Sequence, residues 1–409
     1  MFASLFLKEC KQMLKCLTYY VILVCMLLYF VSQLSEMKIV EKPMPGKTDY
    51  GFIMSDDENV IMRMAISKLA MEFVQNNYIT YPLGFYKTVK LKEEKQSKMG
   101  DITEQVTGLT KDELILKVDN YLKDVTTYSE PLSLSVAEDL TYDNFKELMK
   151  KADKLIGKGS QYSETNLMMN SSVPMTYEQA IVQYNNVITK DHLSGAYARL
   201  FCDYMGLILA ILPVFIAVTR GLRDRRAKAN EIIYSRRVSS FHLIMTRYLA
   251  MLAMLLLPLI LISIIPITEC IYYASNQGIT LDNLSFLKYI FGWLMPTIMV
   301  SLSVGMFFTE LTDSAIAIII QGLWWFISLF TGIENMGGGY GWNLMPRHNT
   351  EGNYQVFHDN FNILVKNRIT YSILAVILVL ATVYIYEMRR RGKLKIGKIR
   401  SNRKSESEE

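Results

Sequence analysis

The chain has 409 residues, a formal net charge of +5 and an apolar fraction of 51%. The apolar residues gather in blocks that are long enough to cross a bilayer, which argues against a soluble multidomain protein and indicates a polytopic membrane protein. The five cysteines show neither a disulfide framework nor a zinc-binding spacing, and the basic segments lack a nucleic-acid-binding motif. The sequence therefore predicts no metal, no cofactor and no nucleic-acid partner, and the basic segments are expected to contact membrane lipid.

The N-terminal residues are predicted to form an amphipathic helix on the inner membrane surface. Residues 1–15 place Phe2, Leu5 and Phe6 on one side at helical spacing, and Glu9 and several lysines on the other. The apolar run 16–34 follows, and at 1.5 Å per residue it spans roughly 28 Å, enough for a first transmembrane helix. A cleaved signal peptide is the competing interpretation, because a basic stretch precedes an apolar core.

Residues 37–195 contain no run that could cross a membrane and are predicted to form a mostly helical extracellular domain. They carry 23 acidic and 19 basic residues, a net charge of −4, whereas the segments expected in the cytoplasm are basic. A helix is expected to end at Gly157, and another is expected across residues 87–106. Three further helix starts are predicted by capping boxes, in which a hydroxyl and a Glu or Gln satisfy orphan amides. These boxes are Ser55–Glu58, Thr110–Glu113 and Thr176–Gln179.

This domain offers no recognisable active site. Its only histidine is His192, it has no cysteine, and no catalytic constellation can be assembled from its residues. Gly46-Lys47-Thr48 resembles the end of a phosphate-binding loop, but Glu41 stands where the first glycine belongs and no strand is expected before it. The chain is therefore predicted not to be an enzyme.

The segment 220–247 is a polar, basic loop between two apolar runs. It carries eight Lys or Arg residues against two acids, and short loops with that bias remain in the cytoplasm. The loop therefore fixes the orientation of the other segments, and a short helix is expected within it at about 223–235.

Five further transmembrane helices are predicted after the domain, which gives six in total. Pro213, Pro258 and Pro266 lie inside them and predict kinks. The segment 333–368 is expected to lie outside, where two histidines stand ten residues apart and not at metal-ligand spacing; whether this segment re-enters the membrane stays open. The basic tail 387–409 is expected in the cytoplasm, together with the N-terminus. The five predicted spans are 200–219, 248–268, 289–308, 315–332 and 369–386.

The fifth predicted span contains a polar amide, Gln321, one helical turn before Trp325. Such groups in membranes face a partner helix or a cavity rather than lipid. Both residues are therefore expected on the protein-facing side, where they serve helix pairing or, as the alternative, line a transport pathway.

Together these features resemble the permease subunits of type-2 ATP-binding-cassette exporters, in particular Gram-positive bacterial members with a large extracellular domain. The most specific match is residues 229–243, Ala-Asn-Glu-Ile-Ile-Tyr-Ser-Arg-Arg-Val-Ser-Ser-Phe-His-Leu, which is similar to that family's short cytoplasmic helix and turn. Arg237 stands where many members have proline. The similarity covers roughly residues 1–36 and 196–391. It implies an all-α protein of the cell membrane, in which two permease chains pair, as a homodimer or a heterodimer, and two ATPase subunits dock beneath them.

The resemblance also implies export of a hydrophobic or amphipathic substrate, such as a peptide antibiotic or a lipid. This chain has no nucleotide-binding motif, so ATP must be hydrolysed by the partner subunit. The central loop is expected to couple the two subunits, with Glu231 pairing with a cation of the partner and the arginines contacting lipid phosphates or acidic residues. The alternative function is a membrane receptor or sensor whose extracellular domain binds a ligand. The expected coupling residues are Arg225, Arg226, Glu231, Ile232, Ile233 and Tyr234.

Overall fold

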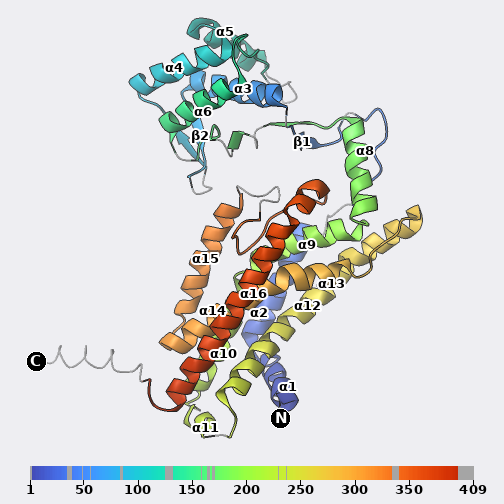
Figure 1. The fold of residues 1–409 in the computed structure, drawn as a ribbon, viewed down its shortest axis with the longest axis vertical. Helices are drawn as coiled ribbons and strands as arrows, with labels where there is room; N and C mark the ends of the chain where they lie inside the picture. Colours follow the sequence, from blue (N-terminus) through green and yellow to red (C-terminus); the bar gives the residue numbers. More distant parts are fainter. Residues whose placement is uncertain are drawn as a thin grey trace, which may run out of the picture. The chain divides into compact units, whose positions relative to one another are not determined.

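The chain is mostly helical and divides into two compact units (Figure 1). The first comprises Met1–Lys42 and Val182–Glu409, and the second comprises Pro43–Ile181. The second unit lies within residues 37–195, which were expected to form a separate domain, and the residues that follow Ile181 belong to the first unit. The computed structural model describes all residues except 1, 35–38, 48, 56, 83–85, 125–131, 158, 164–165, 168–170, 229, 236, 334–339 and 395–409.

The first unit is a bundle of helices. Four of its helical segments, namely α2, α12, the run from α13 to α14, and α16, are long and apolar enough to cross a membrane. The pair α9 and α10 meets at a bend of 42° and forms a fifth candidate if it is one span, whereas α15 is apolar but shorter. The helices are α1 (Phe2–Met13), α2 (Leu17–Leu34), α9 (Ser194–Leu209), α10 (Leu212–Arg226), α11 (Asn230–Tyr234), α12 (Ser240–Gln277), α13 (Ser285–Tyr289), the π-helix η3 (Ile290–Leu294), α14 (Met295–Thr312), α15 (Ile316–Ile333) and α16 (Tyr354–Arg390).

The longest helices extend beyond the apolar runs that predicted them. Helix α12 begins at a cap in which the Ser239 side chain accepts from the His242 amide, and it ends at Gly278 in the left-handed conformation, with φ 66°. Pro258 lies inside α12 and supplies no amide hydrogen to Met254, four residues earlier. The hydroxyl of Tyr19 on α2 donates to that Met254 carbonyl at 3.1 Å. A neighbouring helix thus satisfies the acceptor that proline leaves open.

Helix α1 packs against α12, and one polar residue is not where the amphipathic pattern placed it. Glu9 was expected on the polar face, yet it is buried together with Met13. Its carboxylate accepts from Arg220 of α10, a residue 211 positions away in the chain. The helix predicted at the N-terminus is present, but its packing surface includes an acid because a distant arginine pairs with it.

The second unit has a helical core with two small antiparallel strand pairs, which the sequence did not predict. Helices α3, α4 and α6 pack together, and Ile66, Met99 and Phe145 are fully buried between them. Strand β1 pairs with β4, and β2 pairs with β3. The elements are β1 (Phe52–Met54), α3 (Glu58–Gln75), β2 (Tyr78–Thr80), β3 (Lys87–Val89), α4 (Glu93–Thr107), α5 (Lys111–Asp124), α6 (Tyr142–Ile156), β4 (Ser172–Pro174) and α8 (Tyr177–Asn185), which continues into the first unit.

Two of the three predicted capping boxes are confirmed. Thr110 and Glu113 exchange amide-to-side-chain hydrogen bonds at 3.0 and 3.4 Å, and Thr176 and Gln179 do the same at 3.0 and 3.3 Å. The box predicted at Ser55 is wrong, because the side chain that caps α3 is Asp57. The helix predicted to end at Gly157 is confirmed as α6. Residues 87–106 are not one helix, since β3 precedes α4.

Candidate functional site

The basic loop, residues 220–247, lies at the same end of the bundle as α1 and the C-terminal ends of α10 and α16 (Figure 1). This end of the bundle is termed the α11 end. The helix expected at about 223–235 is interrupted there. Helix α10 continues to Arg226, Lys228 adopts a left-handed backbone with φ 51°, and α11 then covers only Asn230–Tyr234. A non-glycine residue with positive φ cannot continue a right-handed helix, so α11 is separate from α10.

Helix α11 exposes one apolar side chain, that of Ile232, on the surface of the first unit. Ile232 is 63% exposed, whereas Ile233 and Tyr234 are half-buried. The side chain of Glu231 lies outside the described residues. A helix of five residues is not stable alone, because helix nucleation is unfavourable. Its position must therefore come from contacts with the rest of the bundle.

Helix α16 supplies those contacts. The rings of Tyr234 and Tyr386 meet edge to face with centroids 5.5 Å apart. The guanidinium of Arg390 donates to the Tyr234 carbonyl at 3.0 Å and to the Val238 carbonyl at 2.7 Å. Arg390 thereby satisfies a carbonyl at the end of α11 and another in the turn after it, and it fixes the segment to the last helix of the bundle.

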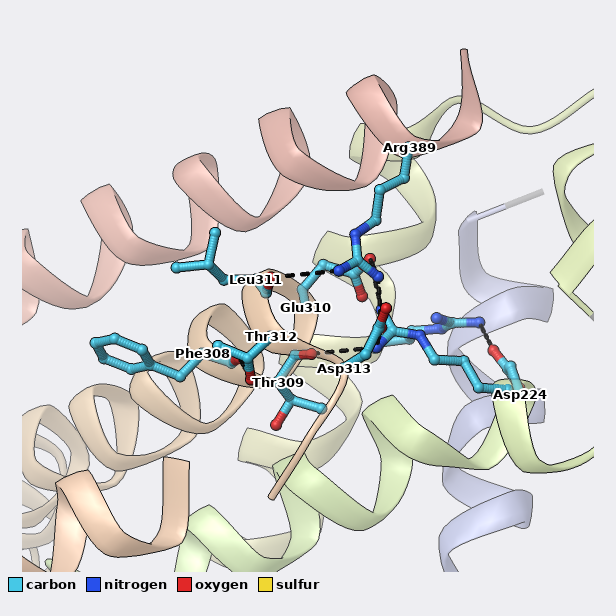
Figure 2. Close-up of polar contacts among 10 residues, drawn as sticks. Asp224, Phe308, Thr309, Glu310, Leu311, Thr312, Asp313 and Arg389 are labelled. Carbon is cyan, nitrogen blue, oxygen red and sulfur yellow. Dashed lines mark hydrogen bonds and ion pairs between the residues drawn. The ribbon is translucent and has the colours of Figure 1, made fainter. Parts of the chain in front are cut away.

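A cluster of charges joins α10, α14 and α16 next to this contact (Figure 2). Arg225 forms ion pairs with Glu310, at 3.0 Å, and with Asp313. Arg389 pairs with Asp313 at 2.6 Å and with Glu310 at 3.6 Å. Two arginines on α10 and α16 therefore hold two acids at the end of α14, and this group of four residues is termed the α14 charge cluster.

A second cluster joins α1, α10 and α12. Arg220 donates to both carboxylate oxygens of Glu9, each at 2.7 Å, and to Asp224 at 3.1 Å. Arg247 of α12 pairs with Asp224 and lies 3.6 Å from Glu9. Burial raises the pKa of the Glu9 carboxyl, but the hydrogen bonds and charge of Arg220, with the charge of Arg247, outweigh it and lower the pKa. Glu9 is thus held as a carboxylate.

These clusters correct part of the expectation for the basic loop. Arg220 and Arg247 lie at its two ends and are buried in ion pairs rather than solvated. Of the two expected coupling arginines, Arg225 pairs with acids of its own chain, whereas Arg226 is exposed. Sequence reasoning missed the acids of α14. The available signal was a turn after the fourth span, residues 309–314, that carries two acids and no basic residue beside a strongly basic loop.

The break between α9 and α10 explains the polar side chains of α15. Pro213 has no amide hydrogen, the Ile211 amide donates to Ile208, and the Val214 amide donates to Ile211. Each of these two amides donates to the residue three positions earlier instead of four. The carbonyls of Leu207 and Ala210 therefore lack their usual amide partners. The Gln321 side-chain amide donates to the Ala210 carbonyl at 2.6 Å, and the Trp325 indole donates to the Leu207 carbonyl at 2.8 Å.

The opposite end of the bundle is closed by residues 340–353, which were expected to lie within an outer segment, 333–368. Buried Asp203 of α9 accepts from Arg347 at 2.8 Å and from the His348 amide at 3.0 Å. The His348 ring contacts the Tyr340 hydroxyl and the Gly352 carbonyl. Burial and the charge of Arg199 lower the pKa of His348 to about 4, so the ring is neutral near pH 7. Helix α16 begins at Tyr354, so the last part of residues 333–368 is helical.

A family model described as ABC-2 family transporter protein matches residues 12–385. No curated protein and no solved structure matches the chain.

Replacing Gln321 by Leu is expected to destabilise the bundle by about 1–3 kcal/mol, because the Ala210 carbonyl then stays buried without a donor. Trp325→Phe keeps an aromatic ring but removes the N–H, so a smaller loss of the same kind is expected. Thermal unfolding of the purified full-length protein in one detergent measures both. Leu323→Met changes an exposed residue of the same helix and serves as the control. Equal midpoints for Gln321→Leu and the control would contradict this role.

Replacing Arg389 by Gln is expected to cost about 1–3 kcal/mol, since it removes one of the two cations that neutralise Glu310 and Asp313. The matched control is Arg391→Gln, which removes an arginine that directly follows α16, is 62% exposed and pairs with Glu387 four residues earlier. Such an exposed pair is worth at most about 1 kcal/mol. The same unfolding assay compares the two variants, and similar losses for both would show that the α14 charge cluster does not stabilise the bundle.

Proposed function

Because this chain belongs to the ABC-2 family of transporter proteins, we propose that it is the membrane subunit of an exporter for a hydrophobic or amphipathic substrate. The family places the chain in the membrane as a subunit of an ABC transporter, and ATP hydrolysis lies with a separate ATPase subunit. Export, as opposed to uptake, is the proposed direction. We also propose that the chain pairs with a second permease chain in the cell membrane.

The proposed docking element for the ATPase is α11. The observation that supports it is an exposed isoleucine, Ile232, on a short helix that the bundle holds in place through Arg390 and Tyr386. A docked ATPase requires an apolar anchor that is accessible in the free subunit and attached to elements that move with it. Glu231, Ile233 and the adjacent arginines complete the proposed contact.

The ion pairs beside α11 give the proposed route for conformational change. Arg225 lies in the last turn of α10, which precedes α11, and pairs with Glu310 of α14. Arg390 contacts α11 directly, and its neighbour Arg389 pairs with the acids of α14. A displacement of α11 by the ATPase would therefore act on α10, α14 and α16 together. Interfaces of this kind move between discrete arrangements rather than deform continuously.

In the proposed topology the chain crosses the membrane six times, with the N- and C-termini in the cytoplasm. The basic residues of the central segment and of the C-terminal tail support this orientation, because short basic loops stay inside. The bent pair of α9 and α10 and the apolar helix α15 supply the spans that are not long straight helices. Unit Pro43–Ile181 is then extracellular.

The topology is tested with single cysteines at Ser133 and Lys228, both exposed, in a background from which the five native cysteines are removed. An impermeant maleimide added to intact cells is expected to label only the Ser133→Cys variant, since a cytoplasmic loop is inaccessible to it. Permeabilised cells should label both variants, which controls for reactivity. Labelling of Lys228→Cys in intact cells would overturn the proposed orientation.

Docking is tested by Ile232→Asp, with Glu231→Ala and Ile233→Asp as companions. Loss of an interface anchor costs about 2 kcal/mol or more, so ATPase affinity should fall roughly thirtyfold and transport-coupled ATP hydrolysis should disappear. Co-purification with the ATPase and turnover in proteoliposomes measure these effects. Arg223→Ala, an exposed residue of α10, is the control and should change affinity far less. If Ile232→Asp and Ile233→Asp bind and turn over like the wild type, α11 is not the docking element.

A further inference from the structure

A cavity of about 430 Å³ lies between α16 and the segment formed by α13 and η3, and the proposed function does not use it. Figure 1 shows α13 beside α16 at the end of the bundle opposite α11. A volume of this size is typical of small-ligand sites, which are mostly apolar with a few polar groups. The lining residues are Lys288, Tyr289, Gly292, Trp293, Phe357, Phe361, Leu364, Val365, Arg368 and Ile369.

Four of the ten lining residues are aromatic. Tyr289 lies 6.3 Å from Trp293 and 6.0 Å from Phe357, and Phe357 lies 5.6 Å from Phe361, measured between ring centroids. Phe361 and Ile369 are also 46% and 55% exposed, so the wall continues onto the outer face of α16. Helix α16 is long and apolar enough to cross a membrane, so in the proposed topology this face is open to lipid near the outer membrane surface and an acyl chain can enter from the side.

Gly292 keeps the cavity open. A methyl group added at its Cβ position would meet no heavy atom within 4 Å. The residue lies in the π-helical turn η3, a conformation that is often found at functional sites because it widens the helix locally. A larger side chain at this position would therefore project into free space without displacing its neighbours.

The lining carries two cations and no carboxylate. Arg368 is buried and donates to the Trp293 carbonyl at 3.0 Å, to Thr297 at 2.7 Å and to three further acceptors, all of them neutral. Among the described residues no acid pairs with Arg368, so its guanidinium is hydrogen-bonded but its charge is not neutralised. Lys288 is 62% exposed and pairs with Asp282 at 2.5 Å. An exposed pair of this kind contributes little and can exchange for another anion.

We propose that this cavity binds one anionic phospholipid, with an acyl chain against the aromatic wall and the headgroup phosphate near Lys288. The apolar wall favours a hydrocarbon chain, and the uncancelled positive charge favours an anionic over a zwitterionic lipid. Each Lys or Arg near a membrane surface contributes about 1 kcal/mol to such a preference. The site is separate from α11 and does not depend on the direction or substrate of transport.

Native mass spectrometry of the delipidated full-length protein in detergent tests this site, with phosphatidylglycerol and phosphatidylcholine as probes. The wild type is expected to bind one phosphatidylglycerol at least tenfold more tightly than phosphatidylcholine. Gly292→Leu fills the cavity and should abolish this binding. Gly322→Leu is the matched control, because Gly322 lies on α15 and its Cβ position also has no heavy atom within 4 Å. This control variant should bind phosphatidylglycerol like the wild type.

A surface variant keeps the test independent of folding. Lys288→Gln should lower phosphatidylglycerol affinity about fivefold, the equivalent of about 1 kcal/mol, and leave phosphatidylcholine affinity unchanged. Equal affinity of the wild type for the two lipids would overturn the proposal. Undiminished phosphatidylglycerol binding by Gly292→Leu would also overturn it, since the lipid would then occupy another surface.

Discussion

Burial of arginine charge is the constraint on which the bundle depends. Removing an ion from water costs several kcal/mol, and an acid together with well-placed hydrogen bonds offsets that cost. Arg220, Arg225 and Arg389 are each largely buried and find their acids on other helices. Because each pair joins helices that are distant in the chain, neutralising the charges also fixes how α1, α10, α12, α14 and α16 pack.

Buried backbone carbonyls, like buried charges, require a hydrogen-bonding partner. A carbonyl that loses its helical amide in an apolar bundle must find another donor, and lipid offers none. The shortened turns around Pro213 and the missing amide of Pro258 open such acceptors, and Gln321, Trp325 and Tyr19 supply donors from neighbouring helices. Tyr19, Gln321 and Trp325 are thus occupied by structural hydrogen bonds, which supports helix pairing as the role of Gln321 and Trp325 over a place in a transport pathway.

Helix α16 connects the two ends of the bundle. Its 37 residues correspond to roughly 55 Å at 1.5 Å per residue. Near its beginning, Asn367 and Arg368 bind the carbonyl of Asn343 in the closing loop, and at its end Arg390 holds α11. In the proposed transporter this single helix would link ATPase docking to the opposite side, and the lipid cavity lies along its first half.

The sequence determined the features that depend on neighbouring residues. Apolar runs located the helices of the bundle, and the Thr110–Glu113 and Thr176–Gln179 boxes located helix starts, because a cap needs only residues three positions apart. Only the tertiary structure decided which charges meet. Glu9 and Arg220 are 211 positions apart in the sequence. Hydropathy indicates that a segment is buried, but it does not indicate which distant residue that segment contacts. The lipid cavity likewise depends on how α16 packs beside η3, and no local pattern encodes that geometry.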